Sequence, residues 1–339
     1  MKLLEVKDLR MFFVTRTETI KAVNGVSFDI NEGETFGLLG ESGSGKSMTC
    51  RSILRLIKRP GRIMGGEILY KGQDILKMNK TALRNIRGKE ISIIFQEPMT
   101  ALNPVLNIKT QINESLLRSR LTQRAKQKRI IELLRLVGIP SPETRISEYT
   151  HQFSGGMRQR VMIATALGGS PKLLLADEPT TALDVTIQDQ VMKLINSLKE
   201  QLGMSMILVT HDLGVVAQMC DRVAVMYAGV IMELTDTVTL FARPRHPYTH
   251  ALMGSIPAHG KERGSKLEPI MGSPPNLSDL PPGCPFWPRC TLAEDICKRE
   301  MADIRPVTPG HLSRCHFPEK TVHFTGLIKM PREQGEERV

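Results

Sequence analysis

The sequence predicts an α/β fold whose core is a parallel sheet, followed by a small C-terminal extension of a different character. Three observations support this prediction. A buried strand at residues 34–39 leads through a glycine-rich loop into a helix that begins near residue 47. The continuous apolar runs at residues 172–176 and 206–210 are typical of central parallel strands that are buried on both faces. After residue 240 prolines become frequent, which leaves little room for regular helix or sheet.

The remaining elements are predicted from local patterns. Short strands broken by Asn24-Gly25 and Gly33 indicate an antiparallel meander before the loop. From residue 110 to residue 138 apolar residues recur at helical spacing, so an inserted helical block interrupts the alternation of strands and helices. A further helix is expected at residues 188–202. The remaining strands are expected at residues 3–6, 20–23, 26–30, 66–70, 91–95, 222–227 and 230–233.

Composition indicates the compartment of the chain and the kinds of partner that suit it. Its 339 residues and 41% apolar content allow a good core and more than one domain, and no apolar run is long enough to span a bilayer. Charges near the N-terminus argue against a secretory leader, so we expect a cytosolic chain whose six cysteines are reduced or bound to metal. The net charge of +11 suits nucleic acid, anionic lipid or the cytoplasmic flank of a membrane protein. Only 4% of residues are aromatic, which argues against single-stranded nucleic acid.

A phosphate-binding loop is predicted at residues 40–47, which read Gly-x-x-x-x-Gly-Lys-Ser. Its glycines let backbone N–H groups turn toward phosphate oxygens, at the positive N-terminus of the following helix. Lys46 can reach the β- and γ-phosphates, and the Ser47 hydroxyl can ligate Mg²⁺. The residues expected to bind the nucleotide here are Gly40, Glu41, Ser42, Gly43, Ser44, Gly45, Lys46, Ser47 and Met48.

Acidic and polar residues follow three of the other predicted strands. Asp177 and Glu178 end an apolar strand, so Asp177 is expected to hold Mg²⁺ and Glu178 to polarise the attacking water as general base. Gln96 follows residues 91–95, and its amide oxygen could complete the Mg²⁺ shell. His211 follows residues 206–210, where its imidazole could bond the γ-phosphate and the attacking water. Catalysis is therefore assigned to Glu178, His211 and Lys46.

These residues, with a further motif, resemble a known family. Residues 153–157 read Phe-Ser-Gly-Gly-Met, which is similar to the Leu-Ser-Gly-Gly-Gln signature of ATP-binding-cassette (ABC) ATPases except at its two ends. Residues 181–184 resemble the family's D-loop, and His211 matches its switch histidine. The resemblance implies a P-loop cassette with a RecA-like parallel core, an antiparallel β subdomain and an inserted helical subdomain. It adds these nucleotide-site residues: Ser154, Gly155, Gly156, Met157 and Asp184.

In that family two ATPase units close head to tail, so the segment at residues 154–157 is expected to serve the ATP of a partner. Phe13 matches the position of an aromatic residue that stacks on adenine, although the adjacent Phe12 is an alternative. The expected domains are a cassette at residues 1–235 with its helical part at about 97–160, an extension at residues 236–330 and a charged tail at residues 331–339.

The extension narrows the resemblance. Residues 243–252 and 283–290 resemble the C-terminal extension of the oligopeptide/dipeptide importer ATPases, and residues 96–104 resemble the same subfamily. This implies the first ATPase of a dipeptide system, peripheral on the cytoplasmic face of the membrane. Its partners would be a second, related ATPase (or a second copy), two permease subunits and an extracytoplasmic peptide-binding protein. Relatives import nickel or glutathione, so both stay open as cargo. A soluble ABC protein that acts on nucleic acid is the less favoured alternative.

Four of the six cysteines lie in the extension, at Cys284, Cys290, Cys297 and Cys315. Their gaps of five, six and seventeen residues are wider than zinc modules favour, whereas a cubane cluster accepts varied spacing. Some members of the resembled subfamily carry a 4Fe-4S cluster. We therefore expect such a cluster, with zinc or unligated thiols as alternatives. His311 and His316 could take part in a zinc site.

Overall fold

The computed structural model describes residues 1–181, 183–255 and 270–323. The chain divides into two compact units, Met1–Val230 and Ile231–Val339. The boundary expected after residue 235 falls at the end of strand β10 (Val230–Asp236). The charged tail expected at residues 331–339 lies outside the described residues.

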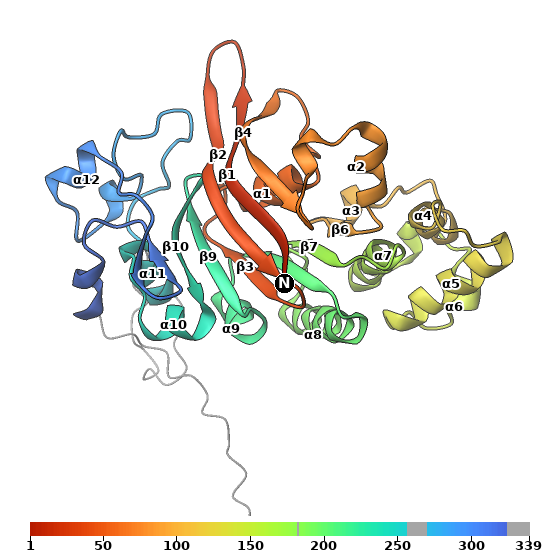
Figure 1. The fold of residues 1–339 in the computed structure, drawn as a ribbon. Helices are drawn as coiled ribbons and strands as arrows, with labels where there is room; N and C mark the ends of the chain where they lie inside the picture. Colours follow the sequence, from red (N-terminus) through yellow and green to blue (C-terminus); the bar gives the residue numbers. More distant parts are fainter. Residues whose placement is uncertain (182, 256–269, 324–339) are drawn as a thin grey trace, which may run out of the picture. The chain divides into compact units, whose positions relative to one another are not determined.

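The first unit contains the antiparallel sheet that the turn pattern predicts. Its strands lie in the order β2-β1-β4-β5, and in Figure 1 the long β1–β2 ribbon rises above the rest of the unit. β1 extends the segment predicted at residues 3–6, and β2 includes both segments predicted at residues 20–23 and 26–30. Residues such as Leu4 and Val6, which alternate along β1, are buried against the core. The bounds are β1 (Lys2–Val14), β2 (Thr19–Asn31), β4 (Gly61–Tyr70) and β5 (Gln73–Asp74).

A parallel sheet forms the centre of the same unit, as predicted. Within the unit its strands lie in the order β9-β3-β8-β7-β6, and every residue of β3, β7 and β8 is buried. Because these strands run in one direction, their carboxyl ends meet at one edge of the sheet. The bounds are β3 (Thr35–Leu39), β6 (Ile91–Ile94), β7 (Leu173–Asp177), β8 (Ser205–Thr210) and β9 (Arg222–Tyr227). Around it lie α1 (Lys46–Ile53), α2 (Lys80–Ile86), α8 (Val185–Leu202) and α9 (Leu213–Met219).

The helical block predicted at residues 110–138 divides into two helices, and further helices flank it. Figure 1 shows α4, α5 and α6 gathered at one side of the unit, beside α7. The break has a local cause, because Thr122 accepts a hydrogen bond from the N–H of Ala125 and so caps a new helix. The bounds are α3 (Pro98–Ala101), α4 (Ile108–Ser115), α5 (Gln123–Leu136), α6 (Pro142–Arg145) and α7 (Gly155–Leu167).

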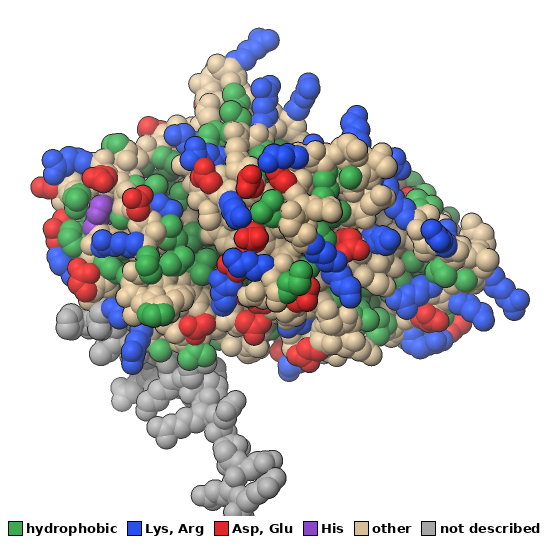
Figure 2. All heavy atoms as spheres, viewed as in Figure 1, with side chains coloured by type: hydrophobic (Ala, Val, Ile, Leu, Met, Phe, Trp, Pro, Cys, Tyr) green, Lys and Arg blue, Asp and Glu red, His purple; other side chains and the backbone are tan. Residues whose placement is uncertain are grey.

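Residues 124–129 read Arg-Ala-Lys-Gln-Lys-Arg, and the charges of this basic run lie on the solvent side of α5. Ile130, Leu133 and Leu134 are buried, while Arg124 and Lys128 are exposed. On the face drawn in Figure 2, lysines and arginines are interspersed with acids, so positive charge does not form one continuous patch there. The helix is therefore amphipathic, with its charges in solvent.

The second unit combines short helices and strands with irregular chain, and within the described part of the proline-rich stretch at residues 244–288 regular structure is limited to α11 and the start of a 3₁₀ turn at Trp287–Arg289. Strands β10 and β12 pair antiparallel, as do β11 and β12. The helices are compatible with proline because Pro247 occupies the first turn of α11, where its missing N–H is not needed. The bounds are α10 (Thr237–Ala242), α11 (Pro247–Gly254), α12 (Asp295–Arg299), β11 (Arg305–Thr308) and β12 (His311–Ser313). Within the described residues, none of the helices combines the length and the apolar character needed to cross a membrane.

Candidate nucleotide site and cysteine pocket

The glycine-rich loop joins β3 to α1 and is packed against neighbouring backbone. Gly40 has a φ of 154°, and a Cβ there would lie 2.2 Å from the carbonyl oxygen of Met226. Gly45 has a φ of 101°, and a Cβ there would lie 2.3 Å from the carbonyl oxygen of Ala22. Only glycine fits at either position, which is why the backbone can fold into a phosphate cradle.

One turn connects this loop to the strands around it. The N–H of Gly229 donates to the carbonyl of Ser44 at 3.0 Å, and the N–H of Asn24 donates to the carbonyl of Gly229 at 2.8 Å. Gly229 follows β9, Asn24 lies in β2, and Ser44 lies in the loop. The loop is therefore tied to both sheets of the first unit.

Lys46 lies inside the loop, almost fully buried. Its ammonium group donates to the carbonyl oxygens of Gly40 at 2.7 Å and Glu41 at 2.9 Å. Burial lowers the pKa of Lys46, and the nearby Glu178, Asp177 and Glu41 carboxylates partly restore it. A buried cation held by neutral carbonyl groups is suited to bind the oxygens of a phosphate.

Ser47 and Asp177 meet as the strand order predicts. The Ser47 hydroxyl donates to Oδ1 of Asp177 at 2.6 Å. The other carboxylate oxygen, Oδ2, is buried and has no hydrogen-bond partner, and Nη2 of Arg51 lies 3.9 Å from it. Burial raises the pKa of Asp177. An unsatisfied buried carboxylate beside a hydroxyl is the donor set that Mg²⁺ prefers, so the residues present fit that ion.

Three side chains converge on one oxygen of Glu178. Its Oε2 accepts a hydrogen bond from the Thr181 hydroxyl at 2.9 Å and one from Nε2 of Gln96 at 3.1 Å, and it lies 3.6 Å from Nδ1 of His211. Lys46 Nζ lies 3.9 Å from Oε1. The close approach of His211 is the largest cause that lowers the pKa of Glu178, and in turn Glu178 raises the pKa of His211. Glu178 is thus an ionised carboxylate at neutral pH, as a general base requires.

Gln96 is therefore directed at Glu178 in this structure and not at Ser47 or Asp177. Its predicted contact with Mg²⁺ stays a prediction, which requires the amide to turn. Glu178 has a φ of 47°, so the chain reverses sharply after β7 and presents the carboxylate at the edge of the sheet.

The signature segment and the D-loop residue lie at helix N-termini on the surface. Ser154 is exposed and caps α7 by accepting from the N–H of Met157 at 3.4 Å. Asp184 is exposed and caps α8 in the same way through Ile187 at 3.0 Å. Gly155 is exposed and Gly156 is half-buried. These groups are accessible to a second molecule, as residues that serve a partner's ATP must be.

Phe13 lies in β1, where it faces Ile20 of β2 and Gly61 of β4 in the register of the strands. Both Phe12 and Phe13 are half-buried. Because neighbouring strand residues point to opposite faces, only one of the two can face a given ligand. The choice between them stays open.

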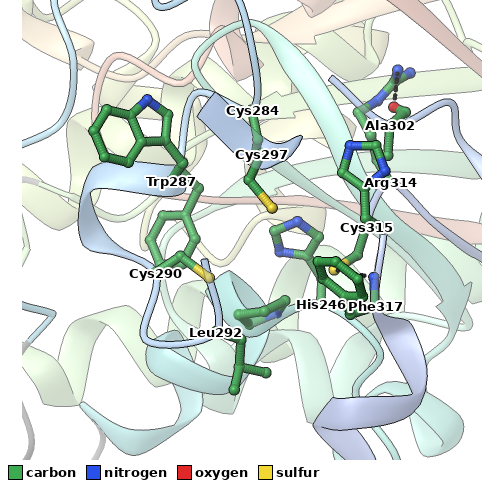
Figure 3. A pocket seen from close by; sticks show the side chains of 13 residues that line it. His246, Cys284, Trp287, Cys290, Leu292, Cys297, Ala302, Arg314, Cys315 and Phe317 are labelled. Carbon is green, nitrogen blue, oxygen red and sulfur yellow. Dashed lines mark hydrogen bonds between the residues drawn. The ribbon is translucent and has the colours of Figure 1, made fainter. Parts of the chain in front are cut away.

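The four cysteines of the extension line one pocket (Figure 3). The six cysteines all lie in the described part of the chain, and none of them forms a disulfide. Burial raises the pKa of Cys284 to about 11 and that of Cys315 to about 12. The walls between the sulfurs are largely apolar and include Phe286, Trp287, Leu292 and Phe317.

The chemistry of this pocket fits a multi-iron cluster better than a single ion. Among the described residues no three His, Cys, Asp or Glu side chains close around one point as metal ligands do. His311 is engaged elsewhere, because its Nε2 lies 2.7 Å from Oε1 of the buried Glu233. Four sulfurs spread around a cavity are suited to the corners of a cubane, whereas zinc needs four ligands near one centre, and the rings of His246 and His316 line the same pocket.

Three residues of these sites are absent from the sequence-based assignment. Thr181 holds Glu178, while His246 and Arg314 line the cysteine pocket. Thr181 could have been found from its position three residues after the acid in a tight turn. The other two lie 38 residues before Cys284 and directly before Cys315, and nothing in their local pattern indicates a shared pocket.

Comparison with known proteins links both units to described families. Residues 23–181 match the ABC transporter family model, and residues 232–297 match the C-terminal region of oligopeptide/dipeptide transporters. The dipeptide transport ATP-binding protein DppD of Bacillus subtilis is 49% identical over 96% of this chain and 98% of its own length. The oligopeptide transport ATP-binding protein OppD of the same organism is 49% identical over 91% of this chain and 87% of its own length.

A solved structure agrees with the fold of the first unit. The ATP-binding cassette MJ0796, described as a dimer in a post-hydrolysis state with ADP and Pi, is 29% identical with a TM-score of 0.62. It covers 69% of this chain and 98% of its own length.

Proposed function

Because this chain belongs to the ATP-binding subunits of ABC transporters and carries the C-terminal region of the oligopeptide/dipeptide group, we propose that it hydrolyses ATP to power the import of small peptides. The observation that carries the proposal is the meeting of Lys46, Ser47, Asp177 and Glu178 at one edge of the sheet. We infer a peptide cargo because its relatives are named as dipeptide and oligopeptide transport proteins.

The first unit would bind ATP through the loop and the metal pair. The loop N–H groups hold the phosphates, and Lys46 exchanges the carbonyls of Gly40 and Glu41 for phosphate oxygens. Ser47 and Asp177 would hold Mg²⁺, which supplies charge neutralisation for the transferred phosphoryl group. Phe13 or Phe12 would stack on the adenine.

Glu178 would act as general base. Its Oε2 takes a proton from the attacking water, while Thr181 and His211 keep the carboxylate oriented and ionised. Gln96 must leave Oε2 for the water to reach it, and its amide oxygen then becomes available to the metal. His211 can then contact the γ-phosphate.

A second ATPase subunit would complete the site. The exposed segment Ser154–Met157 presents a helix N-terminus and a hydroxyl, which together suit a γ-phosphate held by the partner's loop. Asp184 lies beside the same surface of the chain at the start of α8. A related partner is favoured by the resemblance, and a second copy is the alternative in isolation.

A groove of about 850 Å³ in the first unit offers a docking place for a permease subunit at the membrane's cytoplasmic face. It is lined by residues of the strand that leads to Gln96 and by the helical block, including Ile93, Phe95, Leu102 and Met162. An inserted segment there would move the Gln96 loop, which links transport to hydrolysis. Two permeases and an extracytoplasmic binding protein complete the proposed importer.

For the second unit we propose a 4Fe-4S cluster held by Cys284, Cys290, Cys297 and Cys315. A bound cluster would supply a one-electron centre and a structural link among the chain segments that carry the four cysteines, including α12. The test is the iron and acid-labile sulfide content of protein purified without oxygen. About four of each per chain, lost in Cys284→Ser but kept in the matched buried-thiol control Cys220→Ser, is expected. Zinc without sulfide, or no metal, would contradict the proposal.

The importer is tested by reconstituting the ATPase with its permeases and binding protein in vesicles. We expect ATP-dependent uptake of a labelled dipeptide, lost in Glu178→Gln and kept in the exposed control Glu132→Gln. Uptake of nickel or glutathione in place of dipeptide would contradict the proposal that the cargo is a peptide, but it would leave the ATPase assignment intact.

A further inference from the structure

Arg314 is a buried cation fixed at the wall of the cysteine pocket. It directly follows β12 and precedes Cys315. Its Nε donates to the carbonyl of Ile231 at 3.0 Å and its Nη1 to the carbonyl of Ala302 at 3.2 Å, the bond drawn in Figure 3. Its own N–H donates to the carbonyl of Met232 at 2.7 Å. The guanidinium is therefore held in place by neutral acceptors, which leaves its charge uncompensated by these contacts.

The other lining groups carry no permanent charge. The ring of His246 accepts from the N–H of Tyr248 at 3.0 Å, and its burial lowers the pKa of His246 to about 3, so it is neutral. His316 is the remaining titratable lining group besides the thiols, and its Nε2 lies 3.1 Å from the carbonyl of Glu300. Arg314 is thus the one permanently charged side chain among the described residues that line the pocket.

Charges outside the pocket are more exposed. The Asp303 carboxylate acts on Arg314 electrostatically, and Asp303 is exposed. Lys298 lies 5.7 Å from the ring centre of Trp287, but it is half-exposed and paired with Asp295 at 2.8 Å. Water screens these charges, whereas a charge at an apolar wall acts through a low dielectric.

We propose that Arg314 sets the reduction potential of the cluster in this pocket by favouring its reduced form. This inference rests on the proposed 4Fe-4S cluster. With four thiolate ligands the oxidised cubane carries a net charge of about −2, and one electron from a low-potential donor brings it to about −3. No bond forms or breaks and no proton moves. The fixed positive charge stabilises the added negative charge, so Arg314 raises the potential.

The test is a redox titration with dithionite, followed by electron paramagnetic resonance and visible absorbance on the full chain. Arg314→Gln removes the charge and is expected to shift the midpoint to a more negative potential. Arg314→Lys keeps the charge and is expected to stay near the wild-type value. Lys298→Gln, next to Cys297 in sequence but exposed, is the matched control and is expected to leave the midpoint unchanged.

A second variant covers the case in which Arg314→Gln loses its iron. Asp303→Asn removes an exposed negative charge that faces Arg314, and it is expected to raise the midpoint by less than Arg314→Gln lowers it. An unchanged midpoint in an iron-replete Arg314→Gln protein would overturn the inference. Loss of iron in both Arg314 variants with no shift in Asp303→Asn would also overturn it, since the residue would then be only structural.

Two further results distinguish failure of this inference from failure of the proposed ATPase function. Wild-type protein without iron but with ATP turnover would remove the cluster and this inference while the ATPase stands. Protein with a cluster tuned as expected but without ATP turnover would remove the ATPase proposal alone.

Discussion

At the residue scale, the contacts at the carboxyl edge of the parallel sheet gather around one carboxylate oxygen. Oε2 of Glu178 faces Thr181, Gln96 and His211 at once. Since the hydrogen-bond donors stabilise the anion, the pKa of Glu178 is lowered although burial opposes this. In the proposed reaction, the Gln96 amide must leave this oxygen before the oxygen can accept a proton from water.

The first prediction concerns the base itself. Glu178→Gln keeps the shape and removes the basic oxygen, so we expect ATP binding close to wild type with turnover at least about 100-fold lower. Equilibrium nucleotide binding and phosphate release measure the two effects. Glu132→Gln, an exposed acid on α5, is the control. Near-normal turnover in Glu178→Gln would contradict the assignment.

A second prediction concerns Thr181, which the sequence did not single out. Thr181→Val keeps the volume but removes the hydroxyl that bonds Glu178, so the pKa of Glu178 should rise. A base works only above its pKa, and the acid limb of the turnover–pH profile should therefore move to higher pH. Thr181→Ser should restore the wild-type profile. An unmoved acid limb in Thr181→Val would rule out this positioning role.

The sequence anticipated the nucleotide residues better than their neighbours. The meeting of Ser47 and Asp177 was predictable because a motif marks one and parallel strands bring both to the same edge. The contacts of Gln96 were not, since an amide can point at the metal site or at Glu178 with the same backbone. Arg314 was unpredictable because its role depends on a fold that brings distant loops together.

At the scale of elements, strands and helices of the first unit follow the apolar pattern closely. The short helices α10 and α11 of the second unit were not predicted, because they depend on caps and on the placement of Pro247 in a first turn. Asp236 caps α10 through the N–H of Thr239 at 2.8 Å, and His246 caps α11 through Tyr248. Such caps are local signals, but they are weak unless a helix is already expected.

The cap of α10 gives a stability prediction. Asp236→Ala should lower the free energy of unfolding by about 1 kcal/mol, measured by urea denaturation at pH 7. Asp236→Asn, which keeps an acceptor, should lower it by less. Equal stability of wild type and Asp236→Ala would show that the cap contributes nothing.

The same residue predicts a pH dependence. Burial would raise the pKa of Asp236, but hydrogen bonds from the side chain and backbone of Thr239 outweigh it and lower the pKa. The ionised Asp236 therefore contributes its full stabilisation of the folded state above the unfolded pKa of about 3.9. This contribution is lost as the pH falls through the lower pKa of the folded state. In that acidic range the difference in the free energy of unfolding between wild type and Asp236→Ala should decrease. An advantage that is constant down to pH 2 would contradict this.

At the scale of the whole molecule, the proposed pairing of two ATPase subunits relies on the signature segment, whose Ser154 and Gly155 are exposed. Gly155→Asp places a negative charge at the first turn of α7, where the helix tolerates it and a Cβ meets only Leu183 at 3.9 Å. We expect normal ATP binding by the subunit but loss of ATP-driven pairing and turnover, because the carboxylate repels the partner's γ-phosphate.

Pairing is measured by size-exclusion chromatography with ATP in a Glu178→Gln background, which slows hydrolysis. Gly155→Ala is the control and should pair like the parent. ATP-driven pairing that survives Gly155→Asp would place the partner's nucleotide elsewhere.

The turn at Gly229 has a mechanical consequence. Through it, backbone hydrogen bonds run in series from the phosphate loop at Ser44 to Asn24 of the antiparallel sheet, directly beyond the end of β9. Gly229 is thus a junction, because its carbonyl holds the antiparallel sheet and its N–H holds the phosphate loop. A displacement of β2 at Asn24 would therefore reach the carbonyl of Ser44 through a single residue, by backbone contacts alone.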